Sequence, residues 1–338
     1  MIKKWVGRPT PLKSTSCARH IRARPFERTH ELAEAGADAN LKLKAQTPKP
    51  KGKSILASVP PSVARILTAV VLLPILFASI LIEALAPLFA ILAAVALTAG
   101  LFEFWALARK QQIRADRYAA LLSGSALIVI FYFTQPGQLP DLTMIQFVLL
   151  LLTGGTLTAA MVRGAPFDRM IPAAAVTVLS VMYVVLLGGH LVALRVGFRP
   201  SLSRHLLCFY FLVIMGSDVA AYYGGRLFGR HKLAPTVSPG KTWEGAVAGM
   251  LASLLLAVAA HYWFFLNLPL KFALPLAAVM NLVGVLGDLT ESALKRSTGA
   301  KDTAQILPGH GGVLDRIDSL LFNAPVIYYF AWAYFSRG

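Results

Sequence analysis

Residues 84–107 read ALAPLFAILAAVALTAGLFEFWAL, and this stretch decides the kind of fold. A helix needs about 20 mainly apolar residues to cross a hydrocarbon core about 30 Å thick. Similar runs follow one another from Arg65 onward, so we expect an all-α polytopic membrane protein with about nine transmembrane helices. The runs lie near 65–82, 84–107, 118–135, 142–162, 170–194, 205–225, 245–267, 271–289 and 319–336.

The composition of the whole chain agrees with a bilayer protein. Of 338 residues, 56% are hydrophobic and only 14% are charged, and the mean hydropathy of +0.62 excludes an ordinary soluble globule. Cys17 and Cys208 suggest neither a disulfide framework nor a metal knuckle. The net charge of +17 fits cytoplasmic loops, and we expect no nucleic-acid partner.

Two regions differ in character. Residues 1–57 carry thirteen Lys or Arg, scattered prolines and no apolar period, which predicts a basic, disordered N-terminal arm. The arm lacks the apolar core of a secretory signal. Two other interpretations remain: an organellar transit peptide, and a basic arm that contacts anionic lipid headgroups. Residues 58–338 form the expected transmembrane domain.

The basic loops predict an orientation, because Lys and Arg accumulate on the cytoplasmic side of membrane proteins. Basic segments alternate with nearly uncharged ones, and they lie at 109–117, 163–169, 226–241 and 295–316. The segment holding Arg195, Arg199 and Arg204 is one exception. We expect the N-terminus and the polar segments of the C-terminal third to face the cytoplasm.

A first polar cluster begins inside an apolar run at residues 216–226, GSDVAAYYGGR. Asp218 lies at membrane depth, where an ionisable group usually serves a function, although pairing with a helix-end arginine would also explain it. The following segment 238–245, SPGKTWEG, resembles a helix start with Ser238 as cap. Gly240 would let an anion approach the free amides and Lys241 would add a charge, although a capped helix with a solvated lysine looks the same.

A second cluster, 287–296 (GDLTESALKR), follows the eighth apolar run. If the helix continues, Asp288, Glu291, Ser292 and Lys295 share one face. Acids beside a base just past a membrane segment favour a cation and phosphate site over a surface stripe of ion pairs.

The third cluster comprises Lys301-Asp302 and the run 308–319, PGHGGVLDRIDS. Its glycines permit a loop wrapped around phosphates. Asp315 and Asp318 follow at a helix start, and carboxylate oxygens are ligands that Mg²⁺ prefers. His310 could contact phosphate or satisfy a loop carbonyl.

Together these clusters give the chain a family resemblance. Ser292-x-Leu294-Lys295-Arg296, Lys301-Asp302 and the run 308–318 resemble the phosphatidate cytidylyltransferases, also called CDP-diacylglycerol synthases. The dense resemblance covers residues 216–319, with Gly240 where a lysine is expected.

The resemblance implies that CTP and phosphatidic acid react in a polar, cytoplasm-facing cavity, giving CDP-diacylglycerol and pyrophosphate. It implies Mg²⁺, alone or with a second monovalent or divalent cation, in an integral protein of the bacterial cytoplasmic membrane that could form homodimers. The expected catalytic residues are Asp218, Lys241, Glu244, Lys295, Arg296, Asp302, His310 and Arg316. The expected substrate contacts are Ser217, Ser238, Gly240, Lys301, Gly311 and Gly312, and the expected metal ligands are Asp288, Asp315 and Asp318.

Other functions stay open at this point. A transporter or channel would also place acids in the membrane, but no second copy of any polar cluster is visible. A related enzyme for another lipid phosphate, or a lipid kinase that uses CTP, would share the clusters. An assembly protein with degenerate chemistry is disfavoured because the clusters are intact.

Overall fold

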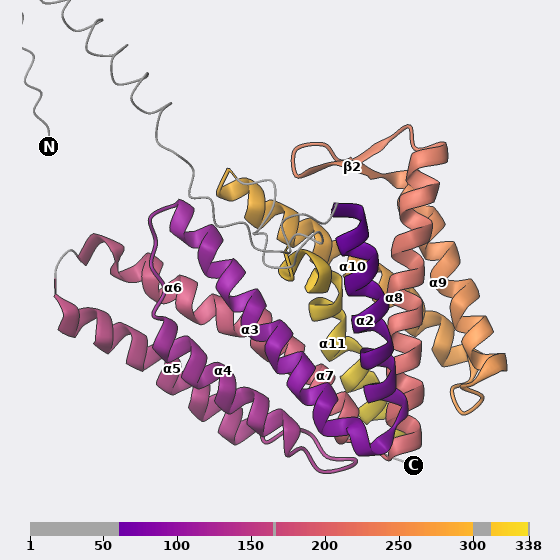
Figure 1. The fold of residues 1–338 in the computed structure, drawn as a ribbon, viewed down its shortest axis with the longest axis horizontal. Helices are drawn as coiled ribbons and strands as arrows, with labels where there is room; N and C mark the ends of the chain where they lie inside the picture. Colours follow the sequence, from indigo (N-terminus) through magenta and orange to yellow (C-terminus); the bar gives the residue numbers. More distant parts are fainter. Residues whose placement is uncertain (1–60, 165–166, 300–311, 337–338) are drawn as a thin grey trace, which may run out of the picture. The chain divides into compact units, whose positions relative to one another are not determined.

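The computed structural model describes residues 61–164, 167–299 and 312–336, and Figure 1 shows that helices dominate this part of the chain. The predicted arm at 1–57 lies outside the described residues. The first helices are α2 (Pro61–Leu81), α3 (Ala86–Lys110), α4 (Arg117–Tyr132) and α5 (Leu142–Arg163), with a 3₁₀ turn η2 (Glu83–Leu85). After η3 (Phe167–Arg169), one helix runs through α6 (Met170–Ser180), a π-helical turn η4 (Val181–Leu186) and α7 (Leu187–Val196). The remaining elements are α8 (Pro200–Phe228), β1 (Lys232–Ala234), β2 (Ser238–Thr242), α9 (Trp243–Trp263), α10 (Leu270–Ser297) and α11 (Leu314–Phe335).

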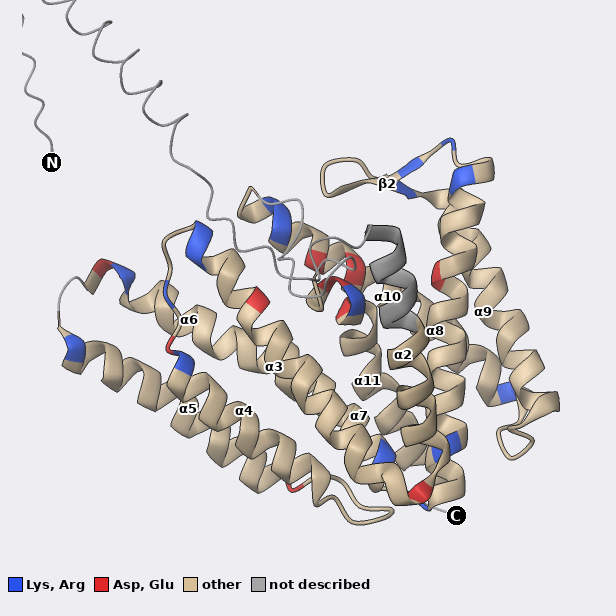
Figure 2. Ribbon diagram, viewed as in Figure 1, with Lys and Arg blue, Asp and Glu red and all other residues tan. Residues whose placement is uncertain are grey.

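The helices confirm the all-α polytopic membrane fold. If α6, η4 and α7 are taken as one helix, the described residues contain a long helical segment at each of the nine predicted runs. Six of these segments are long and apolar enough to cross a bilayer, and Val70–Leu81 and α4 are shorter apolar helices. Figure 2 shows that the middle parts of the helices are almost free of charged residues, as a hydrocarbon environment requires.

Small residues let the C-terminal helices pack closely. Helix α8 packs most extensively against α9, and α10 against α11. A Cβ atom added at Gly224 of α8 would lie 2.4 Å from the Cβ of Ala248 on α9, so any larger side chain would push these helices apart. Without a hydrophobic drive between helices in lipid, such close contact provides much of the attraction.

The predicted helix start at Ser238 is wrong. Residues Ser238–Thr242 form the strand β2, which pairs antiparallel with β1, and α9 begins only at Trp243. The cap is Thr242, whose side-chain oxygen accepts a hydrogen bond from the Gly245 amide at 3.1 Å. Gly240 and Lys241 therefore lie on a hairpin rather than at a helix N-terminus.

One arginine of the exceptional basic segment, Arg195, has a structural role. The guanidinium of Arg195 is buried and donates to the carbonyls of Ser79 and Ile82, each at 3.1 Å. These carbonyls lie at the C-terminal end of α2, where a helix leaves its last acceptors without internal partners. Arg195 thus completes the end of α2.

Candidate functional site

One cavity of about 870 Å³ collects most of the predicted site residues. It lies between the C-terminal half of α8, the hairpin, the start of α9, and the facing parts of α10 and α11. The predicted residues that line it are Asp218, Ser238, Gly240, Lys241, Asp288, Lys295, Asp315, Arg316 and Asp318. Its volume is that of a site for a ligand of nucleotide size.

Three helices bring carboxylates to this cavity: Asp218 from α8, Asp288 and Glu291 from α10, and Asp315 and Asp318 from α11. The close contact of α10 with α11 depends on Gly287, where an added Cβ would lie 2.9 Å from the Asp318 carbonyl oxygen. Asp318 accepts a hydrogen bond from the Ser319 amide at 2.6 Å. Among the described residues Asp218 forms no ion pair, so the alternative that it pairs with a helix-end arginine finds no support.

The hairpin contributes a cation to the carboxylates. The Lys241 Nζ atom lies 2.6 Å from a carboxylate oxygen of Asp288, and the lysine side chain is only 23% exposed. Lys241 is therefore not the solvated lysine of the alternative interpretation. An ammonium and a carboxylate in one open cavity can separate to bind a phosphate and a cation, respectively.

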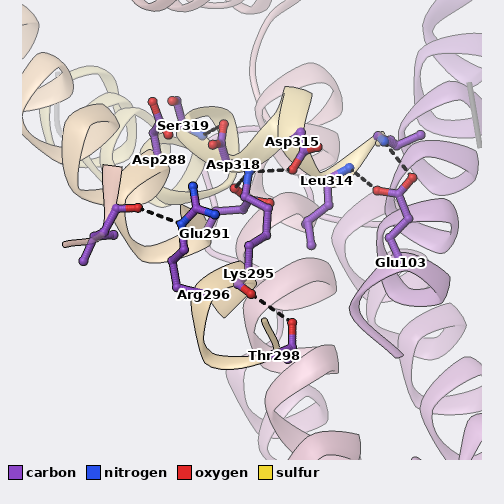
Figure 3. Close-up of polar contacts among 12 residues, drawn as sticks. Glu103, Asp288, Glu291, Lys295, Arg296, Thr298, Leu314, Asp315, Asp318 and Ser319 are labelled. Carbon is purple, nitrogen blue, oxygen red and sulfur yellow. Dashed lines mark hydrogen bonds and ion pairs between the residues drawn. The ribbon is translucent and has the colours of Figure 1, made fainter. Parts of the chain in front are cut away.

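A second charged group lies deeper on α10 and α11. Lys295 Nζ lies 2.6 Å from a carboxylate oxygen of Glu291 and 3.0 Å from one of Asp315. Figure 3 draws these three side chains at the facing parts of α10 and α11. The Glu291 side chain is only 1% exposed. Because α10 continues through Ser297, the predicted common face is confirmed, and the burial of Glu291 excludes a surface stripe of ion pairs.

The donor set fits a hard divalent cation. Mg²⁺ is usually held by one or two carboxylates and fills its other positions with water and substrate phosphate oxygens. Asp288 and Asp318 offer such oxygens in the cavity. Within the described ranges no three His, Cys, Asp or Glu side chains are grouped so that they could hold a metal ion. Asp315 points an oxygen at Lys295, so its predicted metal role stays a prediction.

Several predicted residues lie outside the cavity wall. Glu244 accepts hydrogen bonds from the His231 amide and from the His231 ring at 2.7 Å, so it ties α9 to the start of the hairpin. Arg296 donates to the Val237 carbonyl at 3.2 Å, which holds the hairpin turn against α10. Both positions support Lys241 indirectly.

The other predicted residues are placed as follows. Ser217 is buried, and its hydroxyl donates to the Ile214 carbonyl within α8. Gly312 is buried just before α11. The predicted residues that lie outside the described part are Lys301, Asp302, His310 and Gly311.

Glu103 is an important residue that the sequence analysis missed. It lies fully buried on α3, and its two carboxylate oxygens accept hydrogen bonds from the amides of Val313 at 2.8 Å and Leu314 at 2.7 Å (Figure 3). A carboxylate at a helix N-terminus accepts hydrogen bonds from the unpaired amides and interacts favourably with the positive end of the helix dipole. The signal was available, since Glu103 is a carboxylate within an apolar run.

Glu103→Gln is expected to destabilise the protein by about 2 kcal/mol, because a neutral amide accepts at one oxygen only, so one hydrogen bond is lost and the other is no longer charge-assisted. Thermal unfolding of the purified protein in detergent measures this change. Glu83→Gln is the matched control, because Glu83 is exposed. Equal unfolding temperatures for the two variants would contradict a capping role for Glu103.

Comparison with known proteins agrees with this geometry. The model of the cytidylyltransferase family matches residues 63–334. Phosphatidate cytidylyltransferases of Staphylococcus saprophyticus and Haemophilus influenzae are each 44% identical to this chain, over 127 and 135 residues. These matches cover 38% and 39% of this chain and 49% and 47% of the relatives, so the chain spans about half the length of the curated relatives it matches.

The family match includes every helix that lines the cavity, from α8 to α11. It also includes α3, which carries the buried Glu103 cap. The described helices and their polar cavity thus fall within one family match, and the chain belongs to the cytidylyltransferase family.

Proposed function

We propose that the protein transfers the CMP part of CTP to phosphatidic acid, forming CDP-diacylglycerol and releasing pyrophosphate. The observation that carries the proposal is a single cavity in which five carboxylates, two lysines and two arginines lie beside apolar side chains of membrane helices. Its similarity to named phosphatidate cytidylyltransferases supports the choice of substrates.

The cavity suits a reaction between a soluble and a lipid substrate. Ile214, Met215 and Val219 of α8 line it together with the charged groups, and Met215 and Val219 are also exposed. This apolar wall can hold acyl chains while the charged groups bind phosphates. We further propose that the cavity opens to the cytoplasm of a bacterial cell, where CTP is made.

The reaction needs no nucleophile from the protein. A phosphate monoester has a second pKa near 6, so the lipid phosphate is largely dianionic at neutral pH and can attack the α-phosphorus of CTP as pyrophosphate leaves. The residues therefore act by positioning the two anions and by neutralising their charge.

Each charged residue has a role in that arrangement. Of the four cations that line the cavity, Lys241, Lys295 and Arg316 would bind the triphosphate and the lipid phosphate. Asp288 and Asp318 would hold Mg²⁺, which when bound shields the phosphate charges. Lys241 would leave Asp288 for a phosphate oxygen on substrate binding, which frees the carboxylate for the cation.

Product analysis tests the proposal. The full-length protein in mixed micelles with CTP and Mg²⁺ should release pyrophosphate only when phosphatidic acid is present, in equal amount with a CDP-lipid. Release of CDP instead would identify a lipid kinase. Turnover of another lipid phosphate but not of phosphatidic acid would refute the substrate assignment. If folded protein turned over no lipid phosphate at all, the proposed enzymatic activity would be refuted.

A further inference from the structure

A second cavity, which contains none of the predicted site residues, lies where α3 and α5 end and α6 begins. Its volume is about 640 Å³, and five of its nine lining residues are polar. Four of these are arginines: Arg109, Arg114, Arg163 and Arg169. We call this cavity the arginine pocket.

Defined contacts hold two of the arginines in the wall. Arg169 donates to the Gln112 carbonyl oxygen at 2.8 Å and to the Gln112 side-chain oxygen at 3.3 Å. Arg163 forms an ion pair with Asp116, whose own amide is bonded to the hydroxyl of Thr177 on α6 at 2.9 Å. The loop after α3 is thereby fastened to both α5 and α6.

The backbone conformation of Gln112 is unusual for a residue other than glycine. Its φ of +57° makes it the sole non-glycine residue with a left-handed backbone among the described residues. Glycine is the usual residue at such a helix end, because a side chain there is strained. The glutamine supplies a side-chain oxygen to Arg169 that glycine could not supply.

The other two arginines are available to a ligand. Arg109 and Arg114 are exposed at the pocket, and the described residues provide no hydrogen bond or ion pair to either guanidinium. Asp116 and Asp168 offset only two of the four positive charges, and Asp168 lies 3.9 Å from Arg169. The pocket therefore keeps a net positive charge and two free planar donors, which suit phosphate oxygens.

The surroundings of the pocket are apolar and face outward. One candidate membrane span ends at Arg163 and the next begins at Phe167. Large apolar side chains are exposed on both sides of this junction: Met161, Val162, Phe167 and Ile171. Arginines at the end of membrane spans, above exposed apolar side chains, lie at the depth of lipid headgroups.

We propose that the arginine pocket binds the headgroup of an anionic phospholipid, through its phosphate, at a site separate from the polar cavity. Arg109 and Arg114 bind the phosphate. Arg163 and Arg169 form the wall and add to the positive electrostatic potential of the pocket. The exposed apolar side chains of α5 and α6 contact the acyl chains. A soluble phosphate lacks this second contact, so the pocket selects a lipid.

Lipid binding to the full-length protein in neutral detergent tests the proposal, with native mass spectrometry to count bound lipids. The probes are phosphatidylglycerol, phosphatidylcholine and inorganic phosphate. The test variant is Arg109→Gln/Arg114→Gln. The control is Arg199→Gln/Lys271→Gln, which removes the same charge from two exposed positions at the starts of α8 and α10.

Phosphatidylglycerol should bind about 30-fold more weakly to the test variant than to wild type, since each headgroup arginine contributes about 1 kcal/mol. The control should bind as wild type does, and phosphatidylcholine and inorganic phosphate should bind weakly to all three. Unchanged binding by the test variant, or an equal loss of binding in both variants, would refute the assignment of the lipid site to the arginine pocket. Competition by inorganic phosphate at similar concentrations would overturn the lipid assignment. The measurement does not depend on turnover, so it stands apart from the proposed reaction.

Discussion

Asp318→Asn is expected to lower turnover by about 10³-fold or more, while the protein stays folded. Asp318 faces the polar cavity from α11, and its oxygens are among the few that could hold a divalent cation against the substrate phosphates. Asparagine has nearly the same shape, and its carbonyl oxygen can still accept the bond from the Ser319 amide. The local structure should therefore survive the loss of charge.

The measurement is pyrophosphate release at saturating CTP and phosphatidic acid, followed over a range of Mg²⁺ concentrations. A cation role predicts that the variant needs more Mg²⁺ for half of its residual rate, which a purely structural defect would not produce. Glu83→Gln removes a carboxylate from an exposed position outside the cavity and should behave as wild type. Folded Asp318→Asn protein with a rate within about tenfold of wild type would refute the assignment.

Lys295→Met is expected to destabilise the protein by about 3–5 kcal/mol, the usual cost of removing one partner from a buried ion pair. The ammonium lies between Glu291 and Asp315, at 2.6 Å and 3.0 Å, and the Lys295 side chain is only 15% exposed. Without the lysine, two carboxylates remain close together with no opposite charge between them. Thermal unfolding in detergent measures the loss.

A second substitution separates charge from packing. The double variant Glu291→Gln/Lys295→Met replaces the buried carboxylate with an uncharged amide, so much of the lost stability should return. Turnover should stay low in both variants, because Lys295 lines the cavity. The control is Lys271→Met, an exposed lysine near Phe272. If Lys295→Met were as stable as that control, the buried network would not contribute to the fold.

The helices were predictable from local composition. In lipid a chain must satisfy its backbone hydrogen bonds within each segment, so an apolar run of sufficient length has few alternatives to a helix. The sequence left open whether the run that ends near Leu289 continues as a helix, and α10 does continue to Ser297, so Glu291 and Lys295 lie on one face as their helical spacing requires. The same spacing placed Asp288 on the face that meets the cavity.

The hairpin was not predictable in this way. Ser-Pro-Gly before a helix fits the preferences of a helix N-terminus, and it fits equally well the start of a short edge strand that follows a turn. The choice depends on pairing with Lys232–Ala234 and on the bond from Arg296 to the Val237 carbonyl. A pattern within eight residues contains neither contact.

The sequence by itself determined that the chain is a helical membrane protein and which residue types gather in its C-terminal third, because both follow from short-range composition and spacing. Only the tertiary structure decided which of those side chains meet. Glu103 caps a helix that begins 211 residues further along the chain, and aspartates from three helices share one cavity. Such contacts depend on helix packing, which the close approach at Gly287 and Gly224 controls and which no local pattern specifies.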